Sequence, residues 1–159
     1  MWWIATGIII IIVLGFYLIR HRPKKRPVYP YKPANLLPND AEFMTLLNSY
    51  RNKNLCKWLL VDASACMISY DHTIEMIKLQ KTSHDLAQQR REELYFQGAD
   101  NILEIVDGEF YNVQTAFKGF VNSPSHNRIM LNEEVDTCGL SVRQDDDKKY
   151  YVTVILFKR

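Results

Sequence analysis

The chain has few side chains whose type and spacing would favour catalysis. Ser123, Ser125 and His126 are close together in sequence, but the members of a Ser-His-Asp triad are brought together by the fold and not by adjacency. The Gly-x-Ser-x-Gly motif that positions the nucleophile of α/β-hydrolases is absent from the sequence. His21 lies among basic residues, and His72 lies in a predicted helix, where a surface or partly buried histidine is more common than a ligand. These motifs alone therefore identify no catalytic residue.

Cysteine usage is typical of free thiols and not of a disulfide scaffold. The three cysteines, Cys56, Cys66 and Cys138, are few and odd in number. Cys56 and Cys66 also lack the spacing of metal ligands. The cysteines therefore favour a reducing compartment, although one disulfide between two of them stays open.

Two helices are predicted early in the region that would hold a site. Asn39 is expected to cap the first, with Glu42 three residues later and apolar residues recurring at helical spacing from 43 to 50. The second is expected to begin after Asp62. Its predicted core face is formed by Cys66, Met67, Tyr70, Ile74 and Ile77.

A third helix and a hairpin complete the predicted domain. The segment from Asn112 is expected to bury Val113, Ala116, Phe117 and Phe120. Two β-prone runs, 140–143 and 150–157, flank a polar turn. Because the second run is apolar on nearly both faces, we expect helices above and below the sheet.

The N-terminal segment predicts a membrane anchor. Residues 2–19 carry no charged side chain, and about 18 residues at 1.5 Å each give roughly 27 Å, close to the hydrocarbon thickness of a bilayer. A cleaved signal peptide would need a basic start and a small-residue cleavage site, which the segment lacks. We therefore predict a single transmembrane helix at residues 1–19.

The residues after this helix predict its orientation. Five basic side chains follow at once and are expected to contact the membrane surface: Arg20, Arg22, Lys24, Lys25 and Arg26. Basic flanks resist translocation, so the rest of the chain is predicted to face the cytosol. Residues 20–39 contain five of the six prolines and predict a basic, Pro-rich stalk of roughly 50 Å when extended, with a flexible spacer as the alternative.

The charge balance argues against nucleic-acid binding. Six of the 20 Lys and Arg lie in residues 1–39, which contain no acid, so residues 40–159 carry 14 basic against 18 acidic side chains. A domain with excess negative charge is poorly suited to a phosphate backbone. The basic residues are instead placed where anionic lipid headgroups would lie.

Several short motifs in residues 40–159 appear in an order shared with a known family. They are Leu46–Arg51, Ser83-His84, Gly98–Ile102, Phe120–His126, Met130-Leu131 and Gly139, followed by the closing strand. Together they resemble the CAP superfamily (cysteine-rich secretory proteins, antigen 5, pathogenesis-related proteins; SCP-like) in its short bacterial and viral form. The resemblance implies an α+β fold built as a three-layer α/β/α sandwich over residues 40–159.

The resemblance also implies a cleft lined by histidines and acids. Carried over by position, its residues are His84, His126 and Asp100, supported by Asn101 and by Ser123, which stands where many members place a second acid. Such a set could hold Zn²⁺ in an open three-ligand site that activates water. The preferred interpretation is a structural hydrogen-bonded network with no required cofactor, and a divalent metal stays open.

Two classes of function follow from this reading. The preferred class is a membrane-anchored, non-enzymatic interaction or structural module that docks a protein or lipid partner at a membrane surface. One version is a tether between the internal membrane and the capsid of a virus particle. The alternatives are a metal-dependent hydrolase or protease that uses His84, Asp100 and His126, and a lipid- or sterol-binding protein.

Overall fold

The computed structural model describes residues 36–159. The predicted transmembrane helix and residues 20–35 of the predicted stalk lie outside the described residues. Between residues 36 and 159, no helix is both long enough and apolar enough to cross a membrane. The elements, in chain order, are α2 (Pro38–Lys53), β1 (Leu60–Val61), α3 (Ala63–Leu79), α4 (Ala87–Tyr95), β2 (Asp100–Phe110), α5 (Val113–Asn122), α6 (Pro124–Met130), β3 (Thr137–Gln144) and β4 (Tyr150–Lys158).

A four-stranded sheet in the order β1-β3-β4-β2 forms the centre of the domain. The predicted hairpin is confirmed, since β3 and β4 pair antiparallel, with Leu140 opposite Val154. The short β1 runs parallel to β3, and the long β2 pairs antiparallel with β4. β2 is therefore an edge strand, and its pairing with β4 has register shifts between Asp100 and Leu103 and again between Asp107 and Phe110.

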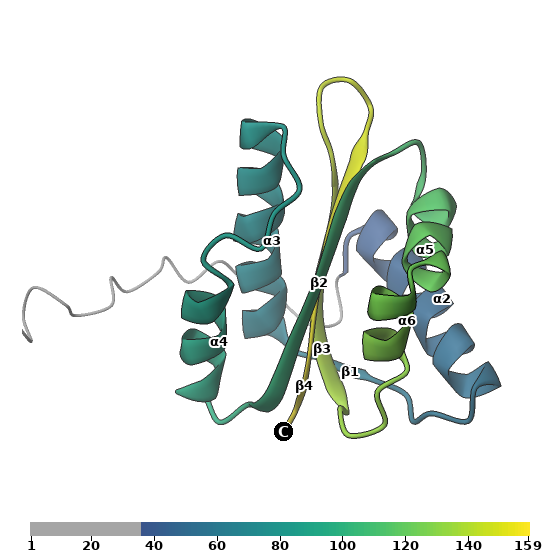
Figure 1. The fold of residues 1–159 in the computed structure, drawn as a ribbon, viewed down its shortest axis with the longest axis vertical. Coiled ribbons are helices and arrows are strands. Elements are labelled where there is room, and N and C mark those ends of the chain that lie inside the picture. The colour runs from purple at the N-terminus through teal and green to yellow at the C-terminus, as the bar shows by residue number, and fades with distance from the viewer. Residues whose placement is uncertain (1–35) are drawn as a thin grey trace, which may run out of the picture. The chain divides into compact units, whose positions relative to one another are not determined.

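Helices cover both faces of the sheet, as the apolar β4 sequence predicts (Figure 1). α3 and α4 lie on one face, and α2, α5 and α6 lie on the other. Alternate β4 side chains supply the two cores: Val152, Val154 and Leu156 pack with the α2 layer, whereas Ile155 and Phe157 pack with α3 and α4. A period of two along a strand buried on both sides explains why the run is apolar throughout. The predicted α+β architecture with three layers is thus observed in the described residues.

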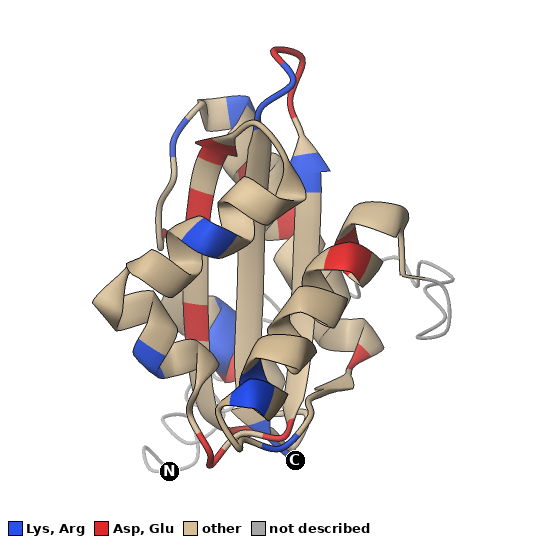
Figure 2. Ribbon diagram, turned by 90° about the vertical axis from the view of Figure 1, so that its right-hand side faces the viewer, with Lys and Arg blue, Asp and Glu red and all other residues tan. Residues whose placement is uncertain are grey.

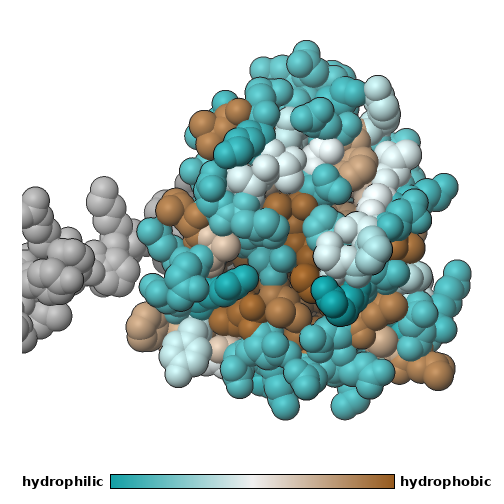
Figure 3. Space-filling model, in the orientation of Figure 1, coloured by the Kyte–Doolittle hydropathy of each residue, from teal (hydrophilic) through white to brown (hydrophobic). Residues whose placement is uncertain are grey.

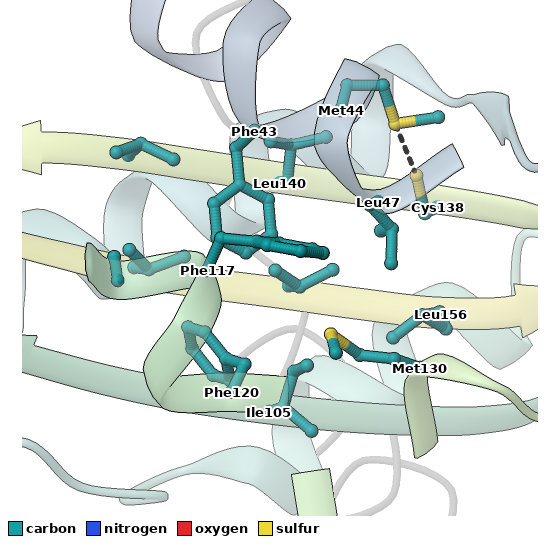
Figure 4. Close-up of a cluster of buried hydrophobic side chains, with 14 of the residues drawn as sticks. Phe43, Met44, Leu47, Ile105, Phe117, Phe120, Met130, Cys138, Leu140 and Leu156 are labelled. Carbon is teal, nitrogen blue, oxygen red and sulfur yellow. Dashed lines mark hydrogen bonds between the residues drawn. The ribbon is translucent and has the colours of Figure 1, made fainter. Parts of the chain in front are cut away.

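Aromatic side chains fill the larger core, between the sheet and α2 (Figure 4). Phe43 meets Phe117 and Phe120 edge to face, with ring centroids 5.6 and 5.7 Å apart. The Cys138 thiol points from β3 toward the Met44 sulfur, 3.5 Å away. All three cysteines belong to the described part of the chain, and none forms a disulfide.

The start of α2 differs from the prediction. The helix begins at Pro38, and Leu37 occupies the cap position without a side-chain cap, so the predicted Asn39 cap is wrong. Proline is well suited to a first helical turn because its missing N–H would have no partner there. Asp40 is fully buried and accepts hydrogen bonds from the Val142 backbone N–H and the Arg143 guanidinium, both at 2.7 Å. A tertiary ion pair therefore attaches this end of α2 to β3.

The start of α3 and the burial of Cys66 are confirmed, but the predicted core face is wrong at Tyr70. The Asp62 carboxylate accepts a hydrogen bond from the Ala65 backbone N–H at 2.9 Å. Tyr70 is exposed, and the helix instead buries a more polar face that includes Ser69, His72 and Thr73. This polar face can be buried because it has a partner on the sheet. The Thr73 hydroxyl donates a hydrogen bond to the Thr153 hydroxyl of β4 at 2.9 Å.

Candidate functional site

The His84 side chain contacts a buried carboxylate on the edge strand β2. Its Nδ1 lies 3.0 Å from Oε1 of Glu104. Arg90 of α4 donates two hydrogen bonds to the same carboxylate, from Nε to Oε2 at 2.6 Å and from Nη2 to Oε1 at 2.8 Å. The Glu104 side chain is 2% exposed, whereas that of His84 is 53% exposed. The acid is therefore enclosed, and the histidine covers it from the solvent side.

The electrostatics of this group are set by the arginine. Burial alone would raise the pKa of Glu104, but the hydrogen bonds from Arg90 and His84 outweigh burial and hold that pKa below its ordinary value. Arg90 also donates from Nη1 to the Asp85 carbonyl at 2.7 Å, which attaches the loop carrying His84 to α4. Glu104 is thus a charged anchor for this loop, with both of its oxygens engaged.

A second histidine from the α3 layer supports the same loop. His72 is buried, and its Nε2 lies 2.8 Å from the Ser83 carbonyl, next to His84 in the chain. Burial and the nearby Arg90 lower the pKa of His72. Because the neutral imidazole is favoured there, His72 supports the loop through a hydrogen bond and not as a charge.

His126 belongs to a separate group on the other side of β2. Its ring lies 5.0 Å from that of Phe120, centroid to centroid, and its Nδ1 is buried with no hydrogen-bond partner in the described part of the chain. Burial lowers the pKa of His126, Asp107 opposes this shift, and His84 adds to it. Asp107 accepts a hydrogen bond from the Gly108 backbone N–H. The two groups therefore influence each other electrostatically around the edge of β2.

Alternation along the strand explains this division. Ile105 packs with the α2, α5 and α6 layer, and Glu104 contacts Arg90 of the α4 layer. In Figure 1, β2 runs between these two layers. The same view as a space-filling model shows hydrophobic residues at the surface along the middle of this face, flanked by hydrophilic ones (Figure 3). The His84 group and the His126 group thus lie on opposite sides of the edge strand β2.

The acid that contacts His84 is Glu104 and not Asp100. Asp100 is exposed at the start of β2, where it accepts a hydrogen bond from the Asn101 backbone N–H at 2.8 Å. The Asn101 amide donates to Glu134 at 3.1 Å. Asp100 and Asn101 line a surface depression beside α4. The first register shift of β2 separates this pair from Glu104.

Ser123 also lies apart from the acid. It occupies the cap position of α6, and its hydroxyl is 3.2 Å from that of Ser125. The five basic residues expected at the membrane surface, Arg20, Arg22, Lys24, Lys25 and Arg26, lie outside the described residues.

One sequence signal could have found Glu104, since a charged residue between Leu103 and Ile105 in an apolar strand is rarely buried without a partner.

The donor set does not fit a divalent metal. Within residues 36–159, no group of three or more His, Cys, Asp or Glu side chains lies where it could hold a metal ion. Glu104 already accepts two hydrogen bonds from Arg90 and one contact from His84, so a metal would have to displace a buried cation.

Comparison with known families agrees with the residues and the fold. The model of the cysteine-rich secretory protein family, CAP, matches residues 44–157. The chain belongs to the CAP family. A comparison with curated protein sequences gives no match.

Three solved structures similar to this CAP domain come from bacteria. An outer surface protein from Borrelia burgdorferi has a TM-score of 0.70 and 19% identity, over 79% of this chain and 96% of that one. A cysteine-rich secretory protein from Staphylococcus aureus has a TM-score of 0.64 and 20% identity, over 86% of this chain. An extracellular protein with an SCP domain from Bacillus anthracis has a TM-score of 0.68 and 21% identity, over 90% of this chain. This chain spans 42% and 49% of the latter two proteins, and these likenesses show the fold alone.

Proposed function

We propose that this CAP protein is a membrane-anchored, non-enzymatic interaction module that presents its domain to a partner at a membrane surface. The observation that carries the proposal is the state of Glu104. Its carboxylate is buried and bound by Arg90 through two hydrogen bonds, with His84 against the same oxygen. A general base must reach its substrate, and this carboxylate is 2% exposed with both of its oxygens already bound by Arg90.

The same group has a clear structural task. Arg90 links β2 to α4 through Glu104 and to the His84 loop through the Asp85 carbonyl. His72 fixes the other end of this loop through the Ser83 carbonyl. A buried polar network of this kind holds a surface in one shape, and a binding module needs a surface of constant shape.

The N-terminal sequence supports placement at a membrane. The uncharged residues 2–19 are long enough to span, and the basic residues from Arg20 to Arg26 follow directly. This order favours a domain on the cytosolic side. Because two of the similar structures are described as outer surface and extracellular proteins, the opposite side is the outcome against which the orientation must be tested.

A tether inside a virus particle is the narrowest form of the proposal. The stalk sequence, rich in proline, would hold the domain away from the bilayer and toward a capsid. Particles stripped of lipid should then lose the chain. If stripped particles kept the chain at full copy number, this form of the proposal would be refuted and the general one would stand.

Two measurements test the general proposal. The full chain, expressed in cells, should remain with membranes after washing at alkaline pH, and its domain should be digested by protease only when the cytosolic side is open. Release by the alkaline wash would refute the anchor. Protection from cytosolic protease would place the domain on the opposite side.

The non-enzymatic part is tested in the same cells. Photo-cross-linking from exposed Tyr70 and Tyr95, each replaced by a photoreactive residue, should capture the same partners with native histidines and with His84→Ala and His126→Ala together. Circular dichroism checks that the histidine variant folds. If the histidine variant captured the same partners but no longer functioned in the cells, the histidines would take part in chemistry. That result would refute a purely binding role.

A further inference from the structure

Residues 54–60, which are the connection between α2 and β1 together with the first residue of β1, expose three large apolar side chains. Leu55 is 94% exposed, Trp58 is 66% exposed and Leu60 is 71% exposed. Cys56 and Leu59 alternate with them and are buried. We call residues 54–60 the apolar loop. Its apolar side chains and its cysteine thus divide into two that hold the loop to the domain and three that face solvent.

The backbone of the apolar loop is fixed by buried polar side chains of α2. Arg51 is fully buried, and its Nε donates to the Lys57 carbonyl at 2.8 Å. Asn48 makes a reciprocal pair with Leu59, donating to its carbonyl at 3.2 Å and accepting from its N–H at 2.9 Å. The exposed side chains are therefore displayed by a braced turn, which lowers the ordering cost of any contact they make.

Arg51 extends this bracing to the neighbouring connection, residues 131–136. Its Nη1 donates to the Met130 carbonyl at 2.7 Å and to the Asn132 carbonyl at 2.9 Å. The Cys56 thiol reaches the Leu131 carbonyl at 3.4 Å. Arg51 and Cys56 thus join the apolar loop to the neighbouring connection.

The backbone conformation of Leu55 also indicates that its exposed side chain has a role outside the fold. Its φ of 62° lies in the left-handed region, which disfavours residues with a Cβ. Glycine or asparagine would relieve the backbone, and a polar residue would relieve the exposure. A strained and almost fully exposed leucine gains nothing for the fold, which points to a contact made outside the domain.

We propose that the apolar loop dips into the interfacial region of the lipid bilayer and holds the CAP domain against the membrane. The loop combines tryptophan and leucine with Lys57, and Lys53 lies just before it. Tryptophan and long basic side chains are the residues that prefer the boundary between water and lipid. Figure 3 shows hydrophobic residues at the surface at lower right, the end of the molecule where α2 ends in Figure 1.

The length of the chain allows this contact. The proposal rests on the membrane anchor of the proposed function, from which residues 20–35 lead to α2. These 16 residues reach roughly 50 Å when extended, whereas the 16 residues of α2 measure about 24 Å from Pro38 to the apolar loop. The far end of α2 is therefore within reach of the bilayer that holds the anchor.

The surrounding charges favour a neutral lipid surface. Glu133 and Glu134 are exposed in the neighbouring connection, and Figure 2 shows acidic and basic residues close together at the end of the domain near the C terminus. Because acidic and basic side chains lie close together there, their attraction to and repulsion from an anionic membrane offset each other. The apolar side chains of the loop therefore make the contact with lipid. Phosphatidylcholine is thus the lipid that tests the loop itself.

Tryptophan fluorescence reports on the loop directly. The chain has three tryptophans, so Trp2→Phe with Trp3→Phe leaves Trp58 as the sole reporter. The full chain is reconstituted into phosphatidylcholine vesicles with or without bromine on the acyl chains. We expect blue-shifted Trp58 emission that brominated lipid quenches. The matched control carries Trp58→Phe and Phe96→Trp in addition to Trp2→Phe and Trp3→Phe, so its sole tryptophan lies at another exposed aromatic position. The emission of this control should be neither shifted nor quenched.

Substitutions separate the loop from the anchor. Leu55→Asp should lower the population of the inserted loop about tenfold or more, since the transfer of one leucine is lost, and should abolish the quenching. Leu79→Asp, at an exposed leucine of α3, should leave it unchanged. Flotation of the vesicles tests the anchor separately.

Each outcome decides between the two proposals. Unquenched Trp58 in chains that float with the vesicles would overturn the loop contact and leave the anchor intact. Chains that do not float would overturn both. A blue shift that depends on protein concentration and is insensitive to bromine would mean that the loop meets a second protein copy, which overturns the lipid contact.

Discussion

Replacing Arg90 with methionine should destabilise the domain strongly, because it leaves a buried carboxylate without its cation. The Arg90 and Glu104 side chains are 8% and 2% exposed, and two hydrogen bonds join them, at 2.6 and 2.8 Å. The substitution also removes the donor to the Asp85 carbonyl. Breaking a buried pair in this way costs about 3 to 5 kcal/mol. We expect the free energy of unfolding to fall by that amount at neutral pH.

The pH dependence of this loss gives an independent signature. In the native protein the pKa of Glu104 is held below its ordinary value, so its contribution to stability is present above the unfolded pKa and is lost as the pH falls through the folded pKa. Without Arg90, burial dominates and should raise the pKa of Glu104 above its unfolded value. The variant then gains stability on acidification relative to the native protein, so the difference between them should shrink from about pH 7 to about pH 4.

Urea unfolding of the full chain in detergent, followed by far-ultraviolet circular dichroism, measures both effects. Arg91→Met, on the exposed face of the same helix, is the matched control and should change stability by about 0.5 kcal/mol or less. Arg90→Met combined with Glu104→Met should recover most of the loss, because no charge is then left unpaired. A single-variant loss below about 1 kcal/mol, or a double variant as unstable as the single one, would refute the reasoning.

Three further outcomes are expected. Gly139→Ala should cost about 3 kcal/mol or more in urea unfolding, because a Cβ there would overlap the Ala65 backbone of α3, and a loss under about 1 kcal/mol would show that the helix can move away. The pKa values of His72 and His126 are lowered by burial, so the unfolded chain protonates first and stability should fall as the pH drops below about 6.5. His126→Asn should flatten that pH profile, and an unchanged profile would exclude His126 as its source. Leu55→Asn should raise stability by about 0.5 to 1 kcal/mol by relieving a positive φ while weakening contact with the bilayer, and a lower stability would mean that Leu55 supports the fold.

Elements with a strong local signal were predictable from sequence. The helix after Asn112 is capped by that residue and buries Val113, Ala116, Phe117 and Phe120, as expected. Its stripe is purely apolar, so the 3.6-residue period is unambiguous. The hairpin and the two-sided burial of β4 follow from an apolar run that only a sheet covered on both faces can bury.

Elements whose buried face includes polar groups were not predictable in the same way. α3 exposes Tyr70 and buries Ser69, His72 and Thr73. The hydroxyl of Thr73 has its partner on β4, 80 residues away in the chain. The burial of a polar residue cannot be predicted until its distant partner is known, so the apolar pattern alone placed Tyr70 in the core and left Ser69, His72 and Thr73 out of it.

The candidate site shows the same limit most clearly. Residue type and motif order were sufficient to predict the family and the layered architecture. A shared cleft for His84 and His126 stays a prediction. The tertiary structure decided which acid meets His84. A register shift near the start of β2 leaves Asp100 at the surface, while Glu104 turns inward to Arg90 of α4. Neighbouring sequence cannot encode this choice, because the guanidinium that stabilises the buried charge is brought to the strand only when α4 packs against the sheet.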